Sequence, residues 1–391
     1  MTSHSPPRQR KVVLLGSTGS IGASALKVAQ DIPERMKIVG LAANRSVDAL
    51  ESQLATTGVQ HAAMWDAKAA TSLRDRVSPD IHVDSGEEGL VRLATLDEAD
   101  MVLIAIIGIA GLKPTLAAIE AGKDIAIASK EILVMAGEIV MAAAARKGVK
   151  VLPIDSEHNA IYQCLENAPA DGHTISRLIL TASGGPFRTL PADQLSNVTL
   201  EQALKHPTWD MGTKITIDSA TLFNKGLEMI EARWLFQTPM QQVDVIVHPQ
   251  SIVHSMVEFV DGSILAQLSH SNMCFPIQYA VTWPDRVANT LEPLDFSKLA
   301  KLNFEAPRVD DFPALRLARQ AGEQGGTLPS VLNAANEVAV EAFTQRHISF
   351  PQIWQIVEDT MQAHELVAQP VLESVLTADQ WARDHAASLI S

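Results

Sequence analysis

The sequence has little cysteine, little basic charge and no long apolar run, and each shortage excludes a class of protein. Only two of its 391 residues are cysteine, Cys164 and Cys274, too few for a disulfide framework or a thiolate metal cluster. Lysine and arginine number 31 against 45 aspartates and glutamates, a net charge of −14. So acidic a chain is not expected to bind nucleic acid, although a few local donors can still bind a phosphorylated small molecule.

The apolar runs are too short to predict a membrane protein. The longest, Met101–Leu112, falls well below the roughly 20 residues that a membrane-spanning helix needs. Three basic residues precede the apolar residues 12–15, as in a signal peptide, but the run stops at Gly16 without a cleavage site. We therefore expect a first β-strand here, a cytoplasmic protein and no membrane partner.

Strand-like and helical patterns alternate in the first part of the chain. The strand-like runs are Lys11–Leu15, Lys37–Ala42, Ala62–Trp65, Met101–Ile107, Ile125–Ala128 and Lys150–Ile154. Helical patterns such as Val47–Thr56 and Glu131–Lys147 lie between them. This alternation is typical of a doubly wound parallel sheet, so the fold class is α/β, with a Rossmann-like domain over residues 1–155.

The remainder of the chain predicts two further domains. Residues 156–283 are expected to form a mixed α/β domain, in which Asp261-Gly262 indicates a two-residue hairpin turn. Its expected strands are Leu178–Thr181, Lys214–Ile217, Asp244–Val247, Val253–Val260 and Ser263–Leu268, and its helices lie near His158–Leu165 and Leu222–Phe236. Residues 284–313 are predicted to be a linker. Residues 314–391 carry helical patterns such as Leu332–Phe343 and Ile353–His364, which predict a C-terminal helical bundle.

A glycine-rich run follows the first predicted strand. Gly16, Gly19 and Gly22 are spaced Gly-x-x-Gly-x-x-Gly, at a strand-to-helix junction where a dinucleotide pyrophosphate can bind the helix N-terminus. The alternative is a purely structural turn. After the second strand, residues 44–46 (Asn-Arg-Ser) contain no acid to bind the ribose of NAD. Arg45 suits the 2′-phosphate of NADP, with Asn44 and Ser46 adding hydrogen bonds, unless Arg45 is a solvated surface charge.

Three carboxylates predict a divalent metal site. Asp155 and Glu157 follow a predicted strand two residues apart, so we expect them to point the same way and to repel each other unless a cation binds. Oxygen ligands favour Mg²⁺ or Mn²⁺ over Zn²⁺. An ordinary helix cap is the alternative. Asn224, Lys225 and Glu228 share one face of a predicted helix that follows a predicted strand, and Glu228 adds the third carboxylate.

Long polar runs of this sequence resemble the 1-deoxy-D-xylulose 5-phosphate reductoisomerase family. The matching runs are residues 16–22, 128–131, 152–160, 182–188, 206–212, 218–221, 224–228, 248–254 and 332–337. The resemblance covers nearly the whole chain after Lys11. It implies a homodimer with NADPH-binding, catalytic and C-terminal helical domains. It also implies the conversion of 1-deoxy-D-xylulose 5-phosphate to 2-C-methyl-D-erythritol 4-phosphate, in the non-mevalonate route to isoprenoids.

The resemblance also assigns roles to individual residues. Asp155, Glu157 and Glu228 would bind Mn²⁺, Mg²⁺ or Co²⁺, and these three and Lys130 are the expected catalytic residues. The substrate's carbonyl and hydroxyl end would meet Lys130, Ser156 and Glu157, and the rest of it, phosphate included, Ser183, His206, Ser219, Asn224 and Lys225. NADPH would contact Thr18, Gly19, Ser20, Ile21, Ser129, Glu131 and Gly212. Ser129 often reads Asn in the family, and residues 44–46 form a variable stretch.

The implied mechanism is a retro-aldol cleavage, an aldol recombination to an aldehyde, and reduction by NADPH. Residues 183–212 begin with Ser-Gly-Gly-Pro and include Trp209, which favours a lid that excludes water, with an ordinary loop as the alternative. Two other functions remain open. One is another NADP-dependent sugar or semialdehyde dehydrogenase, which would lack the three carboxylates or need a catalytic cysteine. The other is an NADPH-sensing regulatory protein without chemistry.

Overall fold

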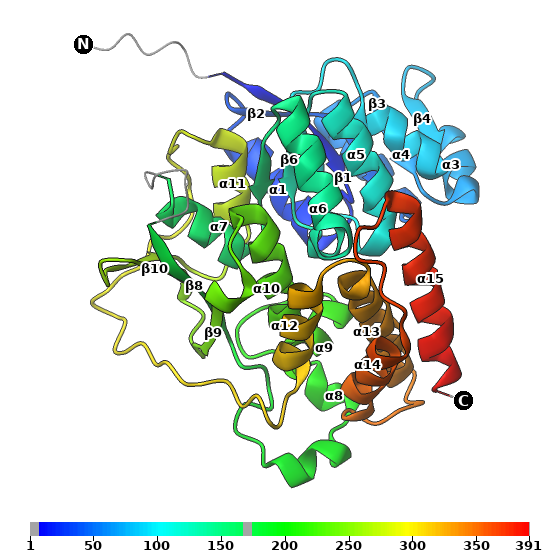
Figure 1. The fold of residues 1–391 in the computed structure, drawn as a ribbon. Helices are drawn as coiled ribbons and strands as arrows, with labels where there is room; N and C mark the ends of the chain where they lie inside the picture. Colours follow the sequence, from blue (N-terminus) through cyan, green and yellow to red (C-terminus); the bar gives the residue numbers. More distant parts are fainter. Residues whose placement is uncertain (1–7, 167–173, 391) are drawn as a thin grey trace. The chain divides into compact units, whose positions relative to one another are not determined.

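The computed structural model describes residues 8–166 and 174–390, which divide into two compact units (Figure 1). The first unit contains residues 8–132, 140–159 and 272–292, and the second contains residues 133–139, 160–166, 174–271 and 293–390. The division into three domains expected from the sequence stays a prediction. Residues 1–7, 167–173 and 391 of those domains lie outside the described part of the chain.

The first unit is built on a seven-stranded parallel sheet in the order β4-β3-β2-β1-β5-β6-β7. The strands are β1 (Arg10–Leu15), β2 (Met36–Ala43), β3 (His61–Met64), β4 (His82–Ser85), β5 (Met101–Ile104), β6 (Asp124–Ile127) and β7 (Val151–Pro153). The chain proceeds outward from β1 first on one side and then on the other. The carboxyl end of β1 therefore lies at the switch point where open α/β sheets bind ligands.

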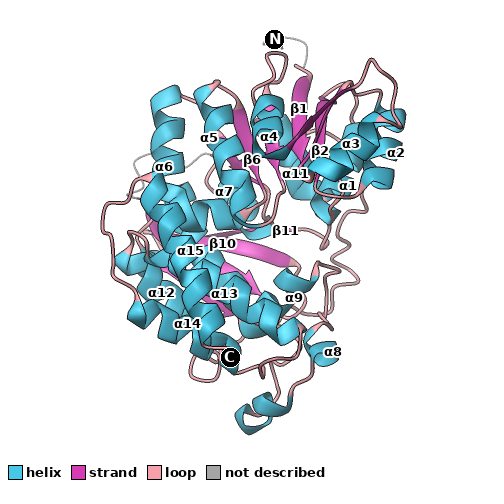
Figure 2. Cartoon of the chain, turned by 90° about the vertical axis from the view of Figure 1, so that its right-hand side faces the viewer, coloured by secondary structure: helices cyan, strands magenta, loops and turns pink. Residues whose placement is uncertain are grey.

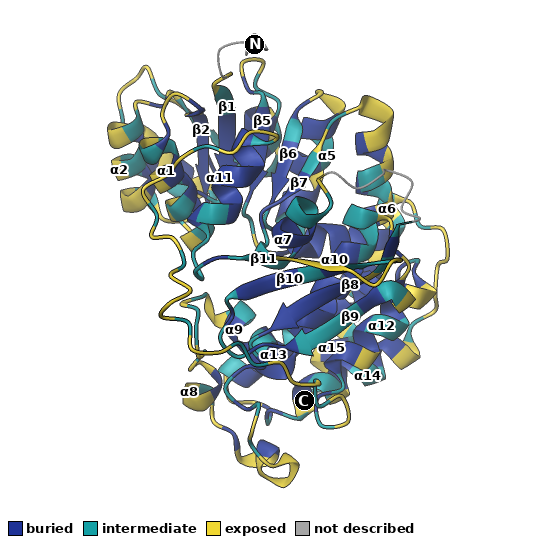
Figure 3. Ribbon diagram, turned by 90° about the vertical axis from the view of Figure 1, so that its left-hand side faces the viewer, coloured by how far each residue is buried: buried dark blue, intermediate teal, exposed yellow. Residues whose placement is uncertain are grey.

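Helices cover both faces of this sheet, which explains why residues 12–15 of β1 and all of β5 are apolar. The helices in this part of the chain are α1 (Ser20–Asp31), α2 (Val47–Thr57), α3 (Ala67–Arg74), α4 (Gly86–Ala94), α5 (Leu112–Glu120), α6 (Lys130–Lys147), α7 (Ser156–Cys164) and α11 (Cys274–Thr282), with a short 3-10 helix at Gly108–Gly111. Helix α1 packs on α11, and α4 packs on α5. Residues 12–15 are fully buried between the two layers, as expected for a central parallel strand (Figure 3).

The second unit has a mixed four-stranded sheet in the order β11-β10-β8-β9. Its strands are β8 (Ile175–Ala182), β9 (Val243–Val247), β10 (Val253–Phe259) and β11 (Ile264–Leu268). Strands β8 and β9 are parallel, whereas β10 is antiparallel to both β8 and β11. The expected hairpin is present, but four residues, 260–263, lie between its two strands instead of two. Phe259 N–H donates to Ser263 O (2.9 Å), and Gly262 takes a left-handed φ of 81°.

The C-terminal helices lie beside this sheet (Figure 2), and they share one apolar core with it. The helices of the second part of the chain are α8 (Leu200–Ala203), α9 (Thr213–Thr221), α10 (Phe223–Phe236), α12 (Ala314–Gln324), α13 (Leu328–Thr344), α14 (Gln352–Ala363) and α15 (Leu372–Ser388), with 3-10 helices at Ala192–Asn197 and Met240–Gln242. Phe223 of α10 and Phe343 of α13 both belong to this core. The predicted fold class, with a helical C-terminus, is therefore confirmed. Among the described residues, no helix is both long and apolar enough to cross a membrane.

Other features of the local structure also differ from the sequence-based expectations. Residues 214–217 belong to helix α9 and not to a strand, so residues 218–228 run from one helix into another through Leu222, whose φ is 66°. The Ile-Thr-Ile run favours a strand locally. However, Lys214 pairs with Asp218 one helical turn later (2.6 Å), and Asp218 accepts a hydrogen bond from Asn336 (2.9 Å). Strand β4 was missed, and β5 ends at Ile104, three residues earlier than expected.

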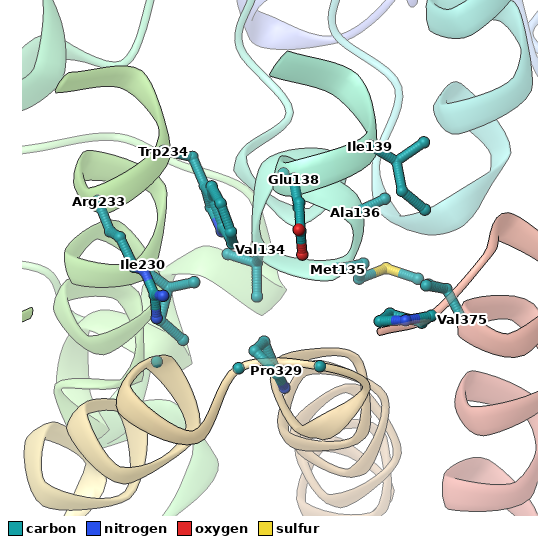
Figure 4. A pocket seen from close by; sticks show the side chains of 15 residues that line it. Val134, Met135, Ala136, Glu138, Ile139, Ile230, Arg233, Trp234, Pro329 and Val375 are labelled. Atoms are coloured by element: carbon teal, nitrogen blue, oxygen red, sulfur yellow. The ribbon is translucent and has the colours of Figure 1, made fainter. Parts of the chain in front are cut away.

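Helix α6 is kinked where it meets α10. Ala136 leaves helical geometry at φ −136° and ψ 28°, and Gly137 faces the ring of Trp234 so closely that a Cβ would lie 2.2 Å from its Cδ1. A small cavity of about 20 Å³ lies beside this contact, with Arg233 and Glu138 among its lining residues (Figure 4). It has room for about one water molecule and is far too small for a sugar phosphate.

Candidate functional site

The glycine loop in the first unit has the geometry of a nucleotide-binding turn. Gly16 has a φ of 97°, and a Cβ there would lie 2.3 Å from the carbonyl oxygen of Ala105, which follows β5. A Cβ on Gly22 would lie 2.3 Å from Ser17 O, so the first turn of α1 packs directly against the loop. Gly19 is the N-cap of α1, and residues 18–21 lie at the helix N-terminus that favours an anion.

Arg45 lies after β2 in the same unit, beside the acid Asp66. The Arg45 side chain is 79% exposed, and its Nε lies 3.2 Å from Asp66 Oδ2. Asp66 caps α3 by accepting hydrogen bonds from the N–H groups of Lys68 and Ala69. The Ala69 N–H chiefly holds the pKa of the Asp66 carboxyl below its ordinary value, and Arg45 adds to this effect. Arg45 is thus a paired surface cation, flanked by the exposed Asn44 and Ser46.

The start of α6 is buried and tied to the sheet. Ser129 is its N-cap residue and donates its hydroxyl to the carbonyl oxygen of Ile106 at 2.6 Å. The next two residues, Lys130 and Glu131, are only 5% and 8% exposed. The hydrogen bond from Ser129 fixes the start of α6 to the segment after β5, next to the strand that carries the glycine loop.

The first unit also contains two of the three predicted metal ligands. Strand β7 ends at Pro153, so Asp155 lies in a bend and Glu157 in the first turn of α7, and the argument from strand alternation was wrong. The junction nevertheless brings carboxylate oxygens of the two residues within 4.8 Å of each other. Lys130 Nζ lies 2.6 Å from Asp155 Oδ2, and Ser156 donates its hydroxyl to Glu157 Oε2 at 2.6 Å.

The third carboxylate, Glu228, is fully buried on α10 in the second unit. Asn224 Nδ2 donates to its Oε1 at 2.6 Å, and Lys225 Nζ lies 2.5 Å from its Oε2. These are the contacts that a spacing of three and four residues permits on one helical face. The predicted grouping of these three side chains is therefore present within the helix.

Three more predicted residues meet elsewhere in the second unit. His206 Nε2 lies 2.9 Å from Ser183 Oγ and 3.0 Å from Ser219 Oγ, and the two hydroxyls are 3.5 Å apart. His206 Nδ1 accepts the backbone N–H of Trp209 at 2.9 Å. We therefore assign the proton of the neutral ring to Nε2, which faces the two hydroxyls. The cluster offers hydroxyl and N–H donors of the kind that bind phosphate oxygens.

The predicted lid, residues 183–212, is only partly loose. Phe187, Leu195 and Ala203 are 5%, 3% and 0% exposed and belong to the core of the second unit. Beyond α8 the segment is more open, and Trp209 lies beside His254 with ring centroids 6.2 Å apart. Gly212 is exposed and caps α9, and a Cβ added to it would meet nothing within 4 Å.

His158 and His254 were not singled out as site residues by the sequence analysis. His158 is fully buried, and its Nδ1 lies 3.9 Å from Asp155 Oδ2. Its position three residues after Asp155, in the first turn of the predicted helix, was the available signal. His254 donates to or accepts from Ser269 Oγ at 2.9 Å and packs beside Trp209, a long-range contact that spacing alone does not reveal.

Family models match three consecutive parts of the chain. Residues 12–137 match "1-deoxy-D-xylulose 5-phosphate reductoisomerase", residues 151–236 match the "1-deoxy-D-xylulose 5-phosphate reductoisomerase C-terminal domain", and residues 268–385 match the "DXP reductoisomerase C-terminal domain". The matches include the glycine loop, the predicted metal ligands and the C-terminal helices.

Full-length relatives carry the same name. The enzymes of Symbiobacterium thermophilum and Chlorobium chlorochromatii are 52% and 51% identical to this chain over 97% of its length, covering 98% and 100% of their own. The reductoisomerase of Zymomonas mobilis, solved with NADPH, is 44% identical with a TM-score of 0.91, over 98% of this chain and all of its own. A reductoisomerase solved with NADPH, fosmidomycin and magnesium is 41% identical with a TM-score of 0.93, over 97% of this chain and 98% of its own. The chain belongs to the 1-deoxy-D-xylulose 5-phosphate reductoisomerase family.

Proposed function

We propose that this chain carries out its family's reaction with the residues assigned below. As a member of the family it is an NADPH- and metal-dependent oxidoreductase that converts 1-deoxy-D-xylulose 5-phosphate to 2-C-methyl-D-erythritol 4-phosphate. The observation that carries this conclusion is 52% identity over 97% of the chain. The direct test is NADPH oxidation in the presence of 1-deoxy-D-xylulose 5-phosphate, with and without Mn²⁺. Turnover that persists in excess chelator would contradict the metal requirement.

Asp155, Glu157 and Glu228 are the proposed ligands of one divalent cation, Mn²⁺, Mg²⁺ or Co²⁺. All three offer carboxylate oxygens, which suit such hard cations. Asp155 and Glu157 have oxygens within 4.8 Å of each other, a spacing whose repulsion a cation relieves. A solved relative binds magnesium, which supports the same choice here.

The reaction asks different tasks of the residues around the ion. When bound, the ion supplies Lewis-acid charge across adjacent substrate oxygens, and NADPH supplies a hydride. Lys130, whose Nζ lies 2.6 Å from Asp155 Oδ2, is proposed to stabilise a developing oxyanion. Ser156 and Glu157 are bonded to each other and are proposed to meet the substrate's carbonyl and hydroxyl end.

NADPH is proposed to bind the glycine loop through Thr18, Gly19, Ser20 and Ile21, with Ser129, Glu131 and Gly212 as further contacts. Asn44, Arg45 and Ser46 are proposed to bind the 2′-phosphate. Asp66 engages the Nε of Arg45, and the terminal guanidinium nitrogens can pair with a phosphate in the bidentate manner typical of arginine.

Arg45 gives this assignment a direct test. Arg45→Ala is expected to raise KM for NADPH and to leave the use of NADH nearly unchanged. Equal efficiency of the unmutated enzyme with both coenzymes would contradict the assignment.

The substrate's phosphate is proposed to bind Ser183, His206, Ser219, Asn224 and Lys225. The hydroxyl and imidazole donors of the first three converge within 3.5 Å. Residues 204–212, which include Trp209, are proposed as the moving part of the lid, because residues 187–203 carry side chains buried in the core. Protease digestion across 204–212 should be slowed by fosmidomycin with Mn²⁺. Equal cleavage with and without these ligands would contradict a lid.

A homodimer is the proposed assembly. Strand β11 is the edge of its sheet, and its side chains Ile264 and Leu265 are 50% and 51% exposed. An exposed apolar edge strand is a surface that native proteins normally cover. The proposed location is the cytoplasm, for which the two free cysteines are suited. Sedimentation of the purified enzyme tests the dimer, and cell fractionation tests the location.

A further inference from the structure

A short segment of the predicted linker is firmly built into the second unit. We call residues 303–308 the strap; they lie in the irregular chain between α11 and α12, yellow in Figure 1. The strap forms a bridge with the end of β9, where the N–H and carbonyl of Val247 exchange hydrogen bonds of 2.9 Å with those of Glu305. Sequence composition predicted a linker here, but this bridge makes the strap an extension of the sheet.

Two residues of the strap, Glu305 and Arg308, are bonded to the start of the predicted lid. Arg308 Nη1 donates to the carbonyl oxygens of Arg188 (3.1 Å) and Leu190 (2.6 Å), and Arg308 Nε donates to Asp311 at 2.7 Å. Arg188 in turn bonds both carboxylate oxygens of Glu305, at 2.6 and 2.5 Å. The backbone five to seven residues after Ser183 is therefore fixed by two arginines at once.

The first two residues of the strap, Asn303 and Phe304, contact the loop between β9 and β10. The carbonyl oxygen of Asn303 accepts from His248 Nδ1 at 2.8 Å, and the side chain of Asn303 accepts from Gln250 Nε2 at 2.7 Å. His248 Nε2 accepts the N–H of Ile252 at 3.2 Å, so the ring is held in one neutral tautomer. It also stacks on Phe304, with ring centroids 4.8 Å apart. The loop is thus bonded to the strap through His248 and Gln250.

This loop presents a hydroxyl to the moving part of the lid. Ser251 has a left-handed φ of 52° and is 8% exposed, so its side-chain direction is fixed at some cost in backbone strain. Its Oγ lies 3.1 Å from Thr208 Oγ1. Thr208 follows His206 by two residues, and its N–H approaches His206 Nδ1 at 3.3 Å. The Thr208–Ser251 bond therefore bears directly on where the His206 ring lies.

We infer that the strap is the fixed frame of the lid, and that Arg308, Ser251 and Thr208 are positioning residues for the reaction. Arg308 positions the stem of the lid, which is the backbone of residues 188–190. Ser251 holds the lid at Thr208, and this places His206 beside Ser183 and Ser219. The inference rests on the proposed substrate roles of Ser183 and His206. These residues act through others and need not touch the substrate.

The Thr208–Ser251 bond is tested by a double-mutant cycle. Thr208→Val, Ser251→Ala and the double variant are compared for kcat, for KM with 1-deoxy-D-xylulose 5-phosphate, and for the Kd of NADPH. Each single change is expected to lower kcat/KM about 2- to 10-fold, the effect of one neutral hydrogen bond. The double variant should fall no further than the worse single variant, because both remove the same bond. Thr208→Ser should restore activity, and the Kd of NADPH should stay constant throughout. If the losses in kcat/KM of the two single variants added up fully in the double variant, the proposed role of the Thr208–Ser251 bond would be wrong.

The stem is tested by Arg308→Met, with Arg316→Met as the matched control. Arg316 is also in the second unit and pairs with Glu358 at 3.1 Å on the surface. Arg308→Met should raise KM for the substrate and speed protease cleavage within 204–212 in the presence of Mn²⁺ and fosmidomycin, whereas Arg316→Met should behave like the wild type. Arg308→Lys serves if the Met variant fails to fold, because a compact ammonium lacks the planar guanidinium fork, in which Nε bonds Asp311 while Nη1 bonds the two carbonyls. Equal behaviour of the folded variants at 308 and 316 would overturn the proposal. The protease measurement does not depend on turnover, so it is separable from a failure of the proposed reaction.

Discussion

Gly16→Ala is a sharp test of the glycine loop, because two separate costs meet at that position. The residue has a φ of 97°, where an L-residue with a Cβ is strained. The new methyl carbon would also lie 2.3 Å from Ala105 O and 2.7 Å from Ala105 C, both of which are backbone atoms. Neither neighbour can turn aside as a side chain would, so the loop or the exit of β5 must shift by about 1 Å to reach ordinary contact.

The magnitude follows from adding the two costs. A left-handed conformation costs an L-residue about 1–2 kcal/mol. Forcing a methyl group into a packed site costs about 1–3 kcal/mol more. We therefore expect Gly16→Ala to lower the free energy of unfolding by about 2–5 kcal/mol. The displaced loop should also weaken NADPH binding at least tenfold, which corresponds to about 1.4 kcal/mol.

Gly58→Ala is the matched control, since Gly58 has a φ of 68° but nothing within 4 Å of its added Cβ. It should show only the conformational cost of about 1–2 kcal/mol and leave the Kd of NADPH unchanged. Denaturant unfolding and titration of NADPH fluorescence measure the two quantities. If Gly16→Ala matched Gly58→Ala in both, the close approach to Ala105 would have no energetic consequence and the reasoning would fail.

Three further predictions concern the proposed catalytic groups and the C-terminal helices. Glu228→Gln should abolish most turnover while leaving the Kd of NADPH nearly unchanged; an active chelator-resistant variant would refute this. Lys225→Ala should raise KM for the substrate strongly, and His206→Ala should lower kcat as well, because it would impair closure of the proposed lid; steady-state kinetics separate the two. Burial lowers the pKa of His364, whose Nε2 lies 2.7 Å from Thr327 Oγ1. Below the ordinary histidine pKa of 6.5, the unfolded chain then binds more protons than the folded chain does. The free energy of unfolding should therefore fall as the pH drops through 6.5, and it should fall less in His364→Gln. If the free energy of unfolding changed by the same amount between pH 7.5 and pH 5.5 in the wild type and in His364→Gln, this prediction would be contradicted.

The sequence predicts the parallel sheet well because its signal is local and strong. Residues 12–15 are apolar at every position, as a strand buried on both faces requires, and they form β1 as expected. Strand β4 is four residues long at the edge of the sheet and includes His82 and Asp84, so it carries no such signal. Residues 214–217 gave a wrong prediction for the opposite reason, because they carry a strand-like pattern but form part of helix α9. Their strand-like pattern is overridden by a pairing with Asp218 and by the long-range contact of Asp218 with Asn336.

The candidate site also combines features that local sequence patterns predict with features that depend on long-range contacts. The face shared by Asn224, Lys225 and Glu228 follows from helical periodicity, and their hydrogen bonds are those that periodicity allows. The meeting of His206 with Ser183 and Ser219 joins residues 23 and 13 positions away, which only the fold can bring together. No sequence spacing encodes such a contact, so only the family resemblance suggested it.

The structure also shows a second task for the two lysines to which the resemblance gives substrate roles. Lys130 lies 2.6 Å from Asp155, and Lys225 lies 2.5 Å from the fully buried Glu228. A buried carboxylate without a partner is strongly destabilising, whereas a hydrogen-bonded cation largely offsets its desolvation. Each lysine therefore stabilises the carboxylate beside it in the folded unit. Because a substituted lysine would remove this counter-ion as well as the proposed substrate contact, loss of activity alone cannot separate the two tasks. The unfolding free energy of the ligand-free variant reports the first, and KM in the folded fraction reports the second.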